Sequence, residues 1–204
     1  MRFGAAGVIL ALVWSGIDPR DRATWWMEVA PVFIAIPVLL FTYRRFTLTP
    51  LLYYLIGLHA LVLIVGGAYT YAHVPFGYQL QDAFALSRNP YDKIGHFMQG
   101  FVPTLIAREI LLRVRCVSGR GMAGFLSVCV AVAVSAVYEM IEWGAALALG
   151  EGANEFLGMQ GDPWDTQSDM FMALLGALAA LASLGRLHNR QLAQIENSNA
   201  RRVT

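Results

Sequence analysis

Acidic and imidazole side chains recur at helical spacing in three apolar segments of this 204-residue chain. Within each segment the members are three or four residues apart, which places them on one face of a helix. An ionisable residue in an apolar helix is costly to bury, usually faces the protein interior and often serves function. Six residues show this pattern: Asp92, His96, Glu139, Glu142, Asp165 and Asp169.

Five carboxylates and one imidazole suggest two kinds of chemistry. Five carboxylates that converge cannot all stay ionised without compensation, so either some are protonated or a bound cation neutralises them. Oxygen ligands with one imidazole suit a divalent metal ion such as zinc, manganese, iron or magnesium, and all six residues are candidate ligands. Such an ion would polarise an ester or phosphoester and activate water. Without a metal, His96, Glu139 and Glu142 are the candidate catalytic acids and bases.

Most of these residues also have a purely structural interpretation. Asp92 follows an Asn-Pro turn and could cap its helix, and Asp165 could cap the last acidic helix. His96 could be a hydrogen-bonded core histidine. Lys93, the only lysine in the chain, is adjacent to Asp92, so helical geometry predicts that it points off the shared face and extends to the membrane interface. The two glutamates lack a comparable structural explanation.

The segments that must position these residues are long and apolar. The chain is 57% hydrophobic and 14% charged, against about 25% charged residues in a typical soluble domain. A bilayer crossing takes about 20 mostly apolar residues, and its backbone groups must be bonded internally, so each crossing is expected to be a helix. We therefore predict an all-α, polytopic membrane helix bundle with about six transmembrane helices: Phe3–Ile17, Trp25–Tyr43, Leu51–Ala72, Asp92–Leu112, Met122–Leu149 and Thr166–Leu187.

The placement of arginine and lysine predicts the orientation of the bundle. The side that holds both termini would carry eleven of the fifteen basic residues, and the other side would carry four. Basic residues concentrate in cytoplasmic loops, so both termini are predicted to be cytoplasmic in a bacterial inner membrane, with the acidic cluster toward the periplasm. Residues 1–190 would form one transmembrane domain, followed by a frayed polar tail at 191–204. The net charge of +1 indicates no nucleic-acid partner and leaves the lipid bilayer as the expected one.

Other polar residues are expected to have lesser roles. His59 is interpreted as a packed, hydrogen-bonded histidine, and His73 could join the acidic cluster. Glu109 is interpreted as one half of a surface ion pair, and Arg108 as a determinant of topology. The connection at 150–165 carries four acidic residues and no basic one, so it is expected to attract cations.

Three motifs resemble a known family of membrane proteins. The stretches YDKIGHFMQGF, YEMIEW and GDPWDTQSDM, in this order, resemble the YjdF-like family of uncharacterised bacterial inner-membrane proteins. The similarity covers most of the chain and is strongest from Asn89 to Leu175. It implies a multi-pass inner-membrane protein and supplies no catalytic residues to carry over.

A shorter similarity concerns VanZ-like membrane proteins. Their Asp-Lys-x-x-His-Phe segment resembles Asp92–Phe97, a later helix glutamate resembles Glu139 or Glu142, and an aspartate in a further helix resembles Asp169. This similarity implies a role in the cell envelope or in lipid chemistry. The GDPWDTQSD segment departs from the VanZ-like pattern, so no function is transferred from it.

These observations support three classes of function. The first is a membrane-embedded enzyme with an outward-facing site, such as a metal-dependent hydrolase that acts on a lipid or envelope substrate. The second is a non-catalytic structural or partner-binding membrane protein, in which the cluster holds helices together. The third is an ion- or proton-coupled transporter. It ranks last because the acids are expected in the outer half of the bundle and the sequence shows no inverted repeat.

Overall fold

Seven helices make up the regular structure of residues 2–149 and 160–203, which are the residues that the computed structural model describes. In chain order they are α1 (Arg2–Ile17), α2 (Arg22–Thr42), α3 (Pro50–Tyr69), α4 (Pro75–Ala83), α5 (Tyr91–Arg113), α6 (Arg120–Leu149) and α8 (Asp165–Val203). None of the described residues lies in a strand, so the all-α prediction is confirmed.

Six of these helices correspond to the six predicted segments, and α4 is an additional short helix. Four of the six, namely α2, α3, α6 and α8, are long and apolar enough to cross a membrane. The other two are less clear, because α1 has 16 residues and α5 carries five acidic or basic residues among its 23. The structure is therefore consistent with a membrane helix bundle, and the number of six crossings stays a prediction.

The last helix, α8, is longer than predicted. It continues to Val203, where the sequence pattern predicts a frayed polar tail at 191–204. The end of this helix is rich in residues of good helix propensity, such as glutamine, leucine, alanine and arginine. Leu192 is buried, and Gln191 Oε1 accepts a hydrogen bond at 3.0 Å from the backbone N–H of Leu51. These contacts tie α8 to the start of α3, which hydropathy alone does not indicate.

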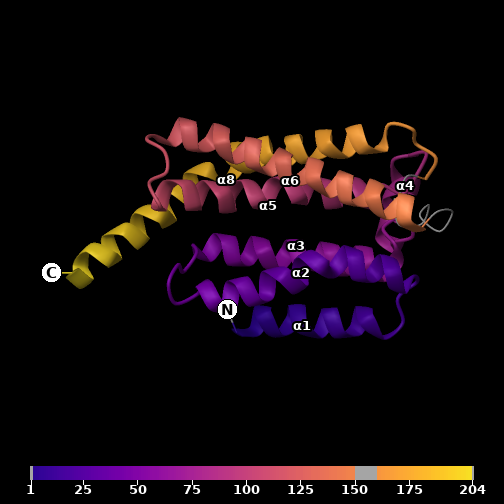
Figure 1. Ribbon diagram of the computed structural model, residues 1–204, viewed down its shortest axis with the longest axis horizontal. Coiled ribbons are helices and arrows are strands. Elements are labelled where there is room, and N and C mark those ends of the chain that lie inside the picture. Colours follow the sequence, from indigo (N-terminus) through magenta and orange to yellow (C-terminus); the bar gives the residue numbers. More distant parts are fainter. Residues whose placement is uncertain (1, 150–159, 204) are drawn as a thin grey trace.

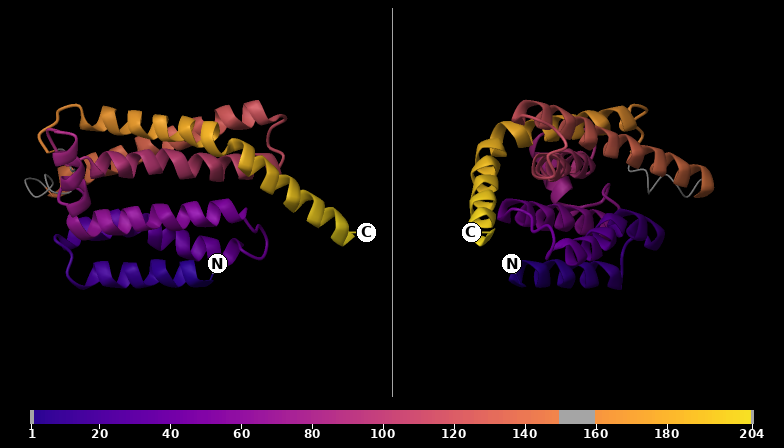
Figure 2. Two further views of the ribbon diagram at one scale, coloured as in Figure 1. Left: turned by 180° about the vertical axis from the view of Figure 1, so that it is seen from behind. Right: turned by 60° about the vertical axis from the view of Figure 1, so that its left-hand side comes forward.

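The helices form two layers. One layer contains α1, α2 and α3, and the other contains α5, α6 and α8 (Figure 1 and Figure 2). The short helix α4 lies at one end of the bundle, and both chain termini lie toward the opposite end. The start of α5, the end of α6 and the start of α8 all lie at the α4 end. This arrangement brings together the three segments that carry the candidate site residues.

Glycines allow α5 and α8 to approach closely. A Cβ atom on Gly100 would collide with the backbone carbonyl of Ala173, and one on Gly176 would collide with the backbone carbonyl of Phe97. Small residues at helix interfaces are typical of membrane bundles, because close backbone approach supplies packing energy where lipid offers no hydrophobic driving force. The contact holds the first turns of α8 alongside α5, so their polar side chains meet.

Apolar side chains hold the remaining helices together. Val29 and Ile64 are fully buried in a cluster that joins α1, α2 and α3. Leu52 and Leu105 are fully buried in a second cluster that joins α3, α5 and α8. Many other large apolar side chains are exposed on the surface of the bundle, as expected where a helix faces lipid tails.

Candidate functional site

The start of α5 is fixed by Asn89, whose side chain is almost completely buried. Asn89 Oδ1 accepts a hydrogen bond at 3.0 Å from the backbone N–H of Tyr91, and Nδ2 donates one at 3.0 Å to the carbonyl of Val74. The N-cap residue of α5 is Pro90, and Asp92 lies within the first helical turn. The interpretation of Asp92 as a helix cap is therefore wrong, and its carboxylate is free to contact side chains in the interior of the bundle.

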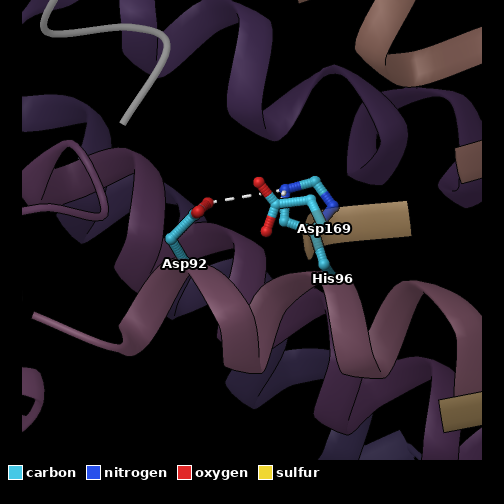
Figure 3. A group of neighbouring side chains, drawn as sticks. All are labelled: Asp92, His96 and Asp169. Atoms are coloured by element: carbon cyan, nitrogen blue, oxygen red, sulfur yellow. Dashed lines mark ion pairs between the residues drawn. The ribbon is translucent and has the colours of Figure 1, made fainter. Parts of the chain in front are cut away.

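Asp92, His96 and Asp169 converge on one point. One potential ligand atom from each lies within 4.8 Å of the other two, and the residues are 8%, 6% and 2% exposed. His96 Nε2 lies 3.5 Å from Asp92 Oδ1 and 3.8 Å from Asp169 Oδ1 (Figure 3). Asp92 and His96 stand on successive turns of α5, and Asp169 reaches them from α8. We call these three residues the triad.

The imidazole of His96 faces acceptors through both ring nitrogens. Its Nδ1 lies 3.1 Å from Gln99 Oε1, and an amide oxygen can only accept, so Nδ1 donates this hydrogen bond. A neutral ring with its proton on Nδ1 would direct the lone pair of Nε2 at two carboxylates. The contact is favourable if a proton lies between Nε2 and a carboxylate, carried by either group, or if a metal ion lies between them.

Two glutamates of α6 border the triad. Glu139 Oε1 is buried, lies 3.6 Å from His96 Nδ1 and has no hydrogen-bond partner among the described residues. Glu142 is 8% exposed and lines a cavity that Asp92 and His96 also line. Neither glutamate belongs to the group of ligand atoms within 4.8 Å. They therefore lie beside the triad and outside the group of atoms close enough to share one ion.

Lys93 points toward the acids of α8. Its Nζ donates hydrogen bonds at 2.7 Å to Asp165 Oδ1, at 2.7 Å to Asp169 Oδ1 and at 2.6 Å to Ser168 Oγ. The prediction that Lys93 extends to the membrane interface is therefore wrong. Lys93 does leave the face of α5 that holds Asp92, but α8 packs along that side, so the ammonium meets the α8 carboxylates.

Arg88 supplies a second cation to the same acids. Its Nη2 donates a hydrogen bond at 2.6 Å to Asp165 Oδ1 and lies 3.3 Å from Asp162 Oδ2. The Asp165 carboxylate is thus bound by two basic residues, and it does not belong to the triad. Asp165 therefore joins α8 to the start of α5 through ion pairs, a role that neither the metal nor the capping interpretation anticipates.

The carboxylates divide into two sets with different neighbours. The acids at the start of α8 contact Lys93 and Arg88. Asp169 belongs to both sets, because its Oδ1 accepts from Lys93 and also faces His96. Asp92 has no ion pair with lysine or arginine closer than 3.9 Å, the distance between Lys93 Nζ and Asp92 Oδ2, and none is recorded for Glu139 or Glu142 among the described residues. Negative charge therefore exceeds positive charge around His96, and a bound cation or shared protons must make up the difference.

A cavity of about 250 Å³ lies beside the triad, between α2, α3, α5 and α6. Glu28 of α2 lines it, is 5% exposed and accepts a hydrogen bond at 3.3 Å from the hydroxyl of Tyr138. Sequence reasoning missed Glu28 because the signal it used for Glu139 was a pair of acids at helical spacing, and Glu28 is the single acid of its apolar helix. His59 lines the same cavity, and its Nε2 has no hydrogen-bond partner among the described residues, contrary to the predicted hydrogen-bonded packing.

A second buried polar cluster lies near the other end of α5. The fully buried Glu109 carboxylate accepts hydrogen bonds at 2.7–3.0 Å from three residues: Thr49, Arg113 and His188. Arg108, which is 4% exposed, donates at 3.2 Å to His188 Nδ1. Because arginine can only donate, His188 Nδ1 accepts, and its Nε2–H donates a hydrogen bond at 3.0 Å to Glu109 Oε2. The interpretation of Glu109 as a surface residue is therefore wrong, and Arg108 has a structural contact beyond any effect on topology.

Two further expectations concern the loops. His73 Nδ1 lies 2.7 Å from the hydroxyl of Tyr78 on α4, so His73 contacts α4 and does not belong to the triad. Of the acidic connection at 150–165, residues 150–159 lie outside the described residues, and the expected attraction of cations to it stays a prediction.

Comparison with known proteins identifies the family. Residues 1–190 match the family model described as predicted membrane protein (DUF2238). The chain belongs to this family. It is 61% identical over 188 residues to inner membrane protein YjdF of Escherichia coli (strain K12), which covers 92% of this chain and 90% of the relative. The resemblance to the YjdF-like family is confirmed, and the resemblance to VanZ-like proteins is not shown. No solved structure matches the chain.

This similarity and the apolar helices agree on the location of the protein. The relative is named as an inner membrane protein, and the family model describes membrane proteins. The described helices include four that are long and apolar enough to cross a bilayer. The chain is therefore an inner-membrane protein in contact with the lipid bilayer.

Proposed function

We propose that the chain is a multi-pass inner-membrane enzyme, a metal-dependent hydrolase that acts on a lipid or envelope substrate. The observation that carries this proposal is the geometry of the triad. Two buried aspartates from different helices direct oxygen atoms at one imidazole nitrogen, with all three atoms within 4.8 Å. Lys93 donates a hydrogen bond to Asp169 Oδ1, but its ammonium lies 3.9 Å from Asp92 Oδ2. A divalent cation between the three groups would satisfy both carboxylates and the imidazole at once.

The chemistry of the surrounding atoms fits a metal ion. Asp92 Oδ2 and Glu139 Oε1 are buried and have no hydrogen-bond partner among the described residues. Buried polar atoms are normally paired, so each unpaired one suggests a missing ligand, ion or water. Two carboxylates and one imidazole suit zinc, manganese, iron or magnesium, and they leave coordination positions open for water and substrate.

Residues beside the triad would complete a hydrolytic reaction. The bound ion would polarise the ester or phosphoester and activate a water molecule. Glu139 or Glu142 would accept a proton as the water oxygen bonds to the acyl carbon or phosphorus. The ester bond would then break, and the leaving oxygen would take up the proton from the same carboxylic acid, which restores the carboxylate. Water is the co-substrate, and no covalent enzyme intermediate is required.

We further propose six crossings, cytoplasmic termini and a site that faces the periplasm. The distribution of basic residues supports this orientation. The position of both termini toward one end of the bundle is consistent with an even number of crossings. Cysteine labelling tests this orientation. A cysteine introduced at Asp82 in α4 should react with a membrane-impermeant reagent in intact cells, and one introduced at Arg44 should not.

Metal content of the purified protein tests the function. Protein in detergent would be loaded with zinc, manganese, iron or magnesium, separated from free ion and analysed by mass spectrometry. We expect about one ion per chain, retained in the Glu196→Gln control and lost in His96→Ala and Asp169→Asn. Glu196 is exposed on α8, so the control repeats the change of charge away from the site. A folded wild type that retains none of the four metals would refute the metal-dependent mechanism.

A second candidate function is structural, and the contacts of Lys93 favour it. The Lys93 ammonium binds α8 to α5 through Asp165 and Asp169, and the guanidinium of Arg88, just before α5, also binds Asp165. If this were the whole role of the cluster, substitution of the triad would lower thermal stability without changing the binding of any ion. Thermal unfolding of the Asp92→Asn variant with and without added metal separates the two functions.

A further inference from the structure

The cavity beside the triad is lined by acidic, aromatic and aliphatic side chains. Glu28, Asp92 and Glu142 line it from three different helices, α2, α5 and α6. Among the described residues that line it there is no lysine or arginine, and the basic groups are two histidines, His59 and His96. A cavity whose charged groups are carboxylates selects a positively charged ligand.

The spacing of these carboxylates sets the size of the cation. Among the described residues, the atoms that lie within 4.8 Å of one another are those of the triad, and neither Glu28 nor Glu142 joins such a group. One small metal ion therefore does not bridge the acids of the cavity. An ammonium group carried on carbon is larger and can donate several hydrogen bonds in different directions. Such a group can contact acids that a single metal ion does not reach together.

Two unpaired atoms show that the cavity lacks a partner. Asp92 is 8% exposed, lines the cavity, and its Oδ2 has no hydrogen-bond partner among the described residues. His59 also lines the cavity, and its buried Nε2 is likewise without a partner in the described part of the chain. The Asp92 oxygen accepts, so a ligand that donates would satisfy it. An ammonium ligand supplies such a donor to Asp92 Oδ2, and the His59 nitrogen adds a second polar atom to the cavity wall.

The rest of the lining suits the carbon atoms of such a ligand. Tyr71 and Tyr138 line the cavity, and aromatic rings attract ammonium groups through cation–π contacts. The remaining walls include valine, isoleucine, leucine and proline side chains. A volume of about 250 Å³ holds roughly eight groups of water size. The ligand is therefore an ammonium group with a short hydrocarbon segment.

We propose that this cavity binds a primary ammonium group on an aliphatic chain, with the ammonium among Glu28, Asp92 and Glu142. This inference rests on the proposed function in that the ligand would be the substrate of the neighbouring metal centre. The chemistry fits both an amine-bearing lipid headgroup and a free alkylamine. Glu28 is then a specificity residue, contributed by the layer of helices that does not carry the triad.

Hexylamine binding tests the proposal, with hexanol as the neutral molecule of the same shape. Calorimetric titration would use detergent-purified protein that has been treated with a chelator, so the result does not depend on a bound metal. We expect the protein to bind hexylamine at least about tenfold more tightly than hexanol, because the ammonium forms charge-assisted hydrogen bonds. Equal affinity for the two molecules would overturn the proposal.

Variants locate the binding. Glu28→Gln should weaken hexylamine binding by about tenfold while keeping the metal content of the wild type, and Glu196→Gln should bind hexylamine normally. If Glu28→Gln does not fold, Ala35→Leu fills the cavity wall without removing a charge and should also weaken binding. Unchanged hexylamine affinity in a folded cavity variant would overturn the proposal. If the protein binds metal but no amine, the proposed function survives and the ammonium site is refuted. If it binds amine but no metal, the ammonium site survives and the metal-dependent function is refuted.

Competition then separates the two sources of the amine. Short-chain phosphatidylethanolamine and phosphatidylglycerol would be added to the hexylamine complex at equal concentrations. Displacement by phosphatidylethanolamine alone identifies a lipid headgroup as the ligand. Displacement by neither lipid identifies a free amine. Equal displacement by both lipids would show that the cavity recognises the acyl chains instead, which overturns the assignment of the ammonium.

Discussion

Replacing Lys93 with methionine removes the ammonium that joins α5 to the acidic start of α8. Methionine keeps much of the length and apolar surface of the lysine stem, so the change is mainly one of charge. In the wild type, Lys93 Nζ donates to Asp165 Oδ1 and Asp169 Oδ1 at 2.7 Å, and its side chain is 18% exposed. After the substitution Asp165 still contacts Arg88, but Asp169 keeps only His96, at 3.8 Å.

The expected loss of folding stability follows from the partners that the acids of α8 lose. Removing one partner of a buried ion pair costs about 3–5 kcal/mol, because the other charge stays buried without compensation. Residual exposure of Lys93 and the remaining Arg88 contact place the expected loss near the lower limit, at about 3 kcal/mol. A domain of this length loses roughly 2–4 °C of Tm for each kcal/mol, so the Tm should fall by roughly 6–12 °C. A lysine that extends to the membrane interface would cost far less.

Thermal unfolding in detergent, followed by tryptophan fluorescence, measures this loss. Arg190→Met is the matched control, because Arg190 is an exposed basic residue of α8. The double variant Lys93→Met/Asp169→Asn should recover part of the lost stability, since it removes the charge that Lys93 had compensated. A Tm for Lys93→Met equal to that of the Arg190→Met control would refute the assignment of Lys93 as the cation of the α8 acids.

Three further predictions test other parts of the bundle by the same assay. Glu109→Ala should lower stability by about 3–5 kcal/mol, because it leaves the buried His188 and the partly buried Arg113 without their carboxylate. Gly100→Ala should disrupt the contact between α5 and α8, whereas Gly144→Ala, where a Cβ meets nothing within 4 Å, should be nearly neutral. Asp21→Ala should cost about 1 kcal/mol through loss of the α2 N-cap. Hydrogen bonds from the backbone hold the pKa of Asp21 below its usual value. Its contribution is therefore present at neutral pH and is lost as the pH falls through the folded-state pKa, which lies below about 4.

The sequence predicts the helices well because one property dominates them. A bilayer requires long apolar segments with internally bonded backbones, so hydropathy and length locate the helices within a few residues. The end of α8 is different, since Leu192 and Gln191 act through contacts with distant residues. The amphipathic helix α4 has only nine residues and falls below the length at which hydropathy patterns are informative. Local pattern thus predicts membrane helices and fails where tertiary contacts decide their ends.

The same distinction applies to the site. Helical spacing predicted that Asp92 and His96 share a face, and leaflet depth suggested that Asp169 lies near them. Spacing does not predict which helix packs on each face of α5, and the direction of Lys93 depended on that packing. Glu109 shows the limit most clearly, because its partner His188 lies 79 residues away in the chain. Arg113, four residues after Glu109, was a sufficient local partner to interpret Glu109 as part of a surface ion pair. Only the fold shows that Glu109 is buried.

The position of the single lysine explains why the acids of this protein divide into two sets. A bundle that needed its acids only for helix association would gain stability by pairing each of them with a basic residue. The start of α8 follows this rule, with Lys93 and Arg88 bound to its aspartates. The cavity does not, because no lysine or arginine is among the described residues that line it, and the nearest recorded one, Lys93, lies 3.9 Å from Asp92 Oδ2. Buried carboxylates without protein cations are costly in the free protein, and a ligand that brings positive charge removes that cost when it binds. The unequal distribution of basic residues is therefore itself an argument for a cationic ligand beside the triad.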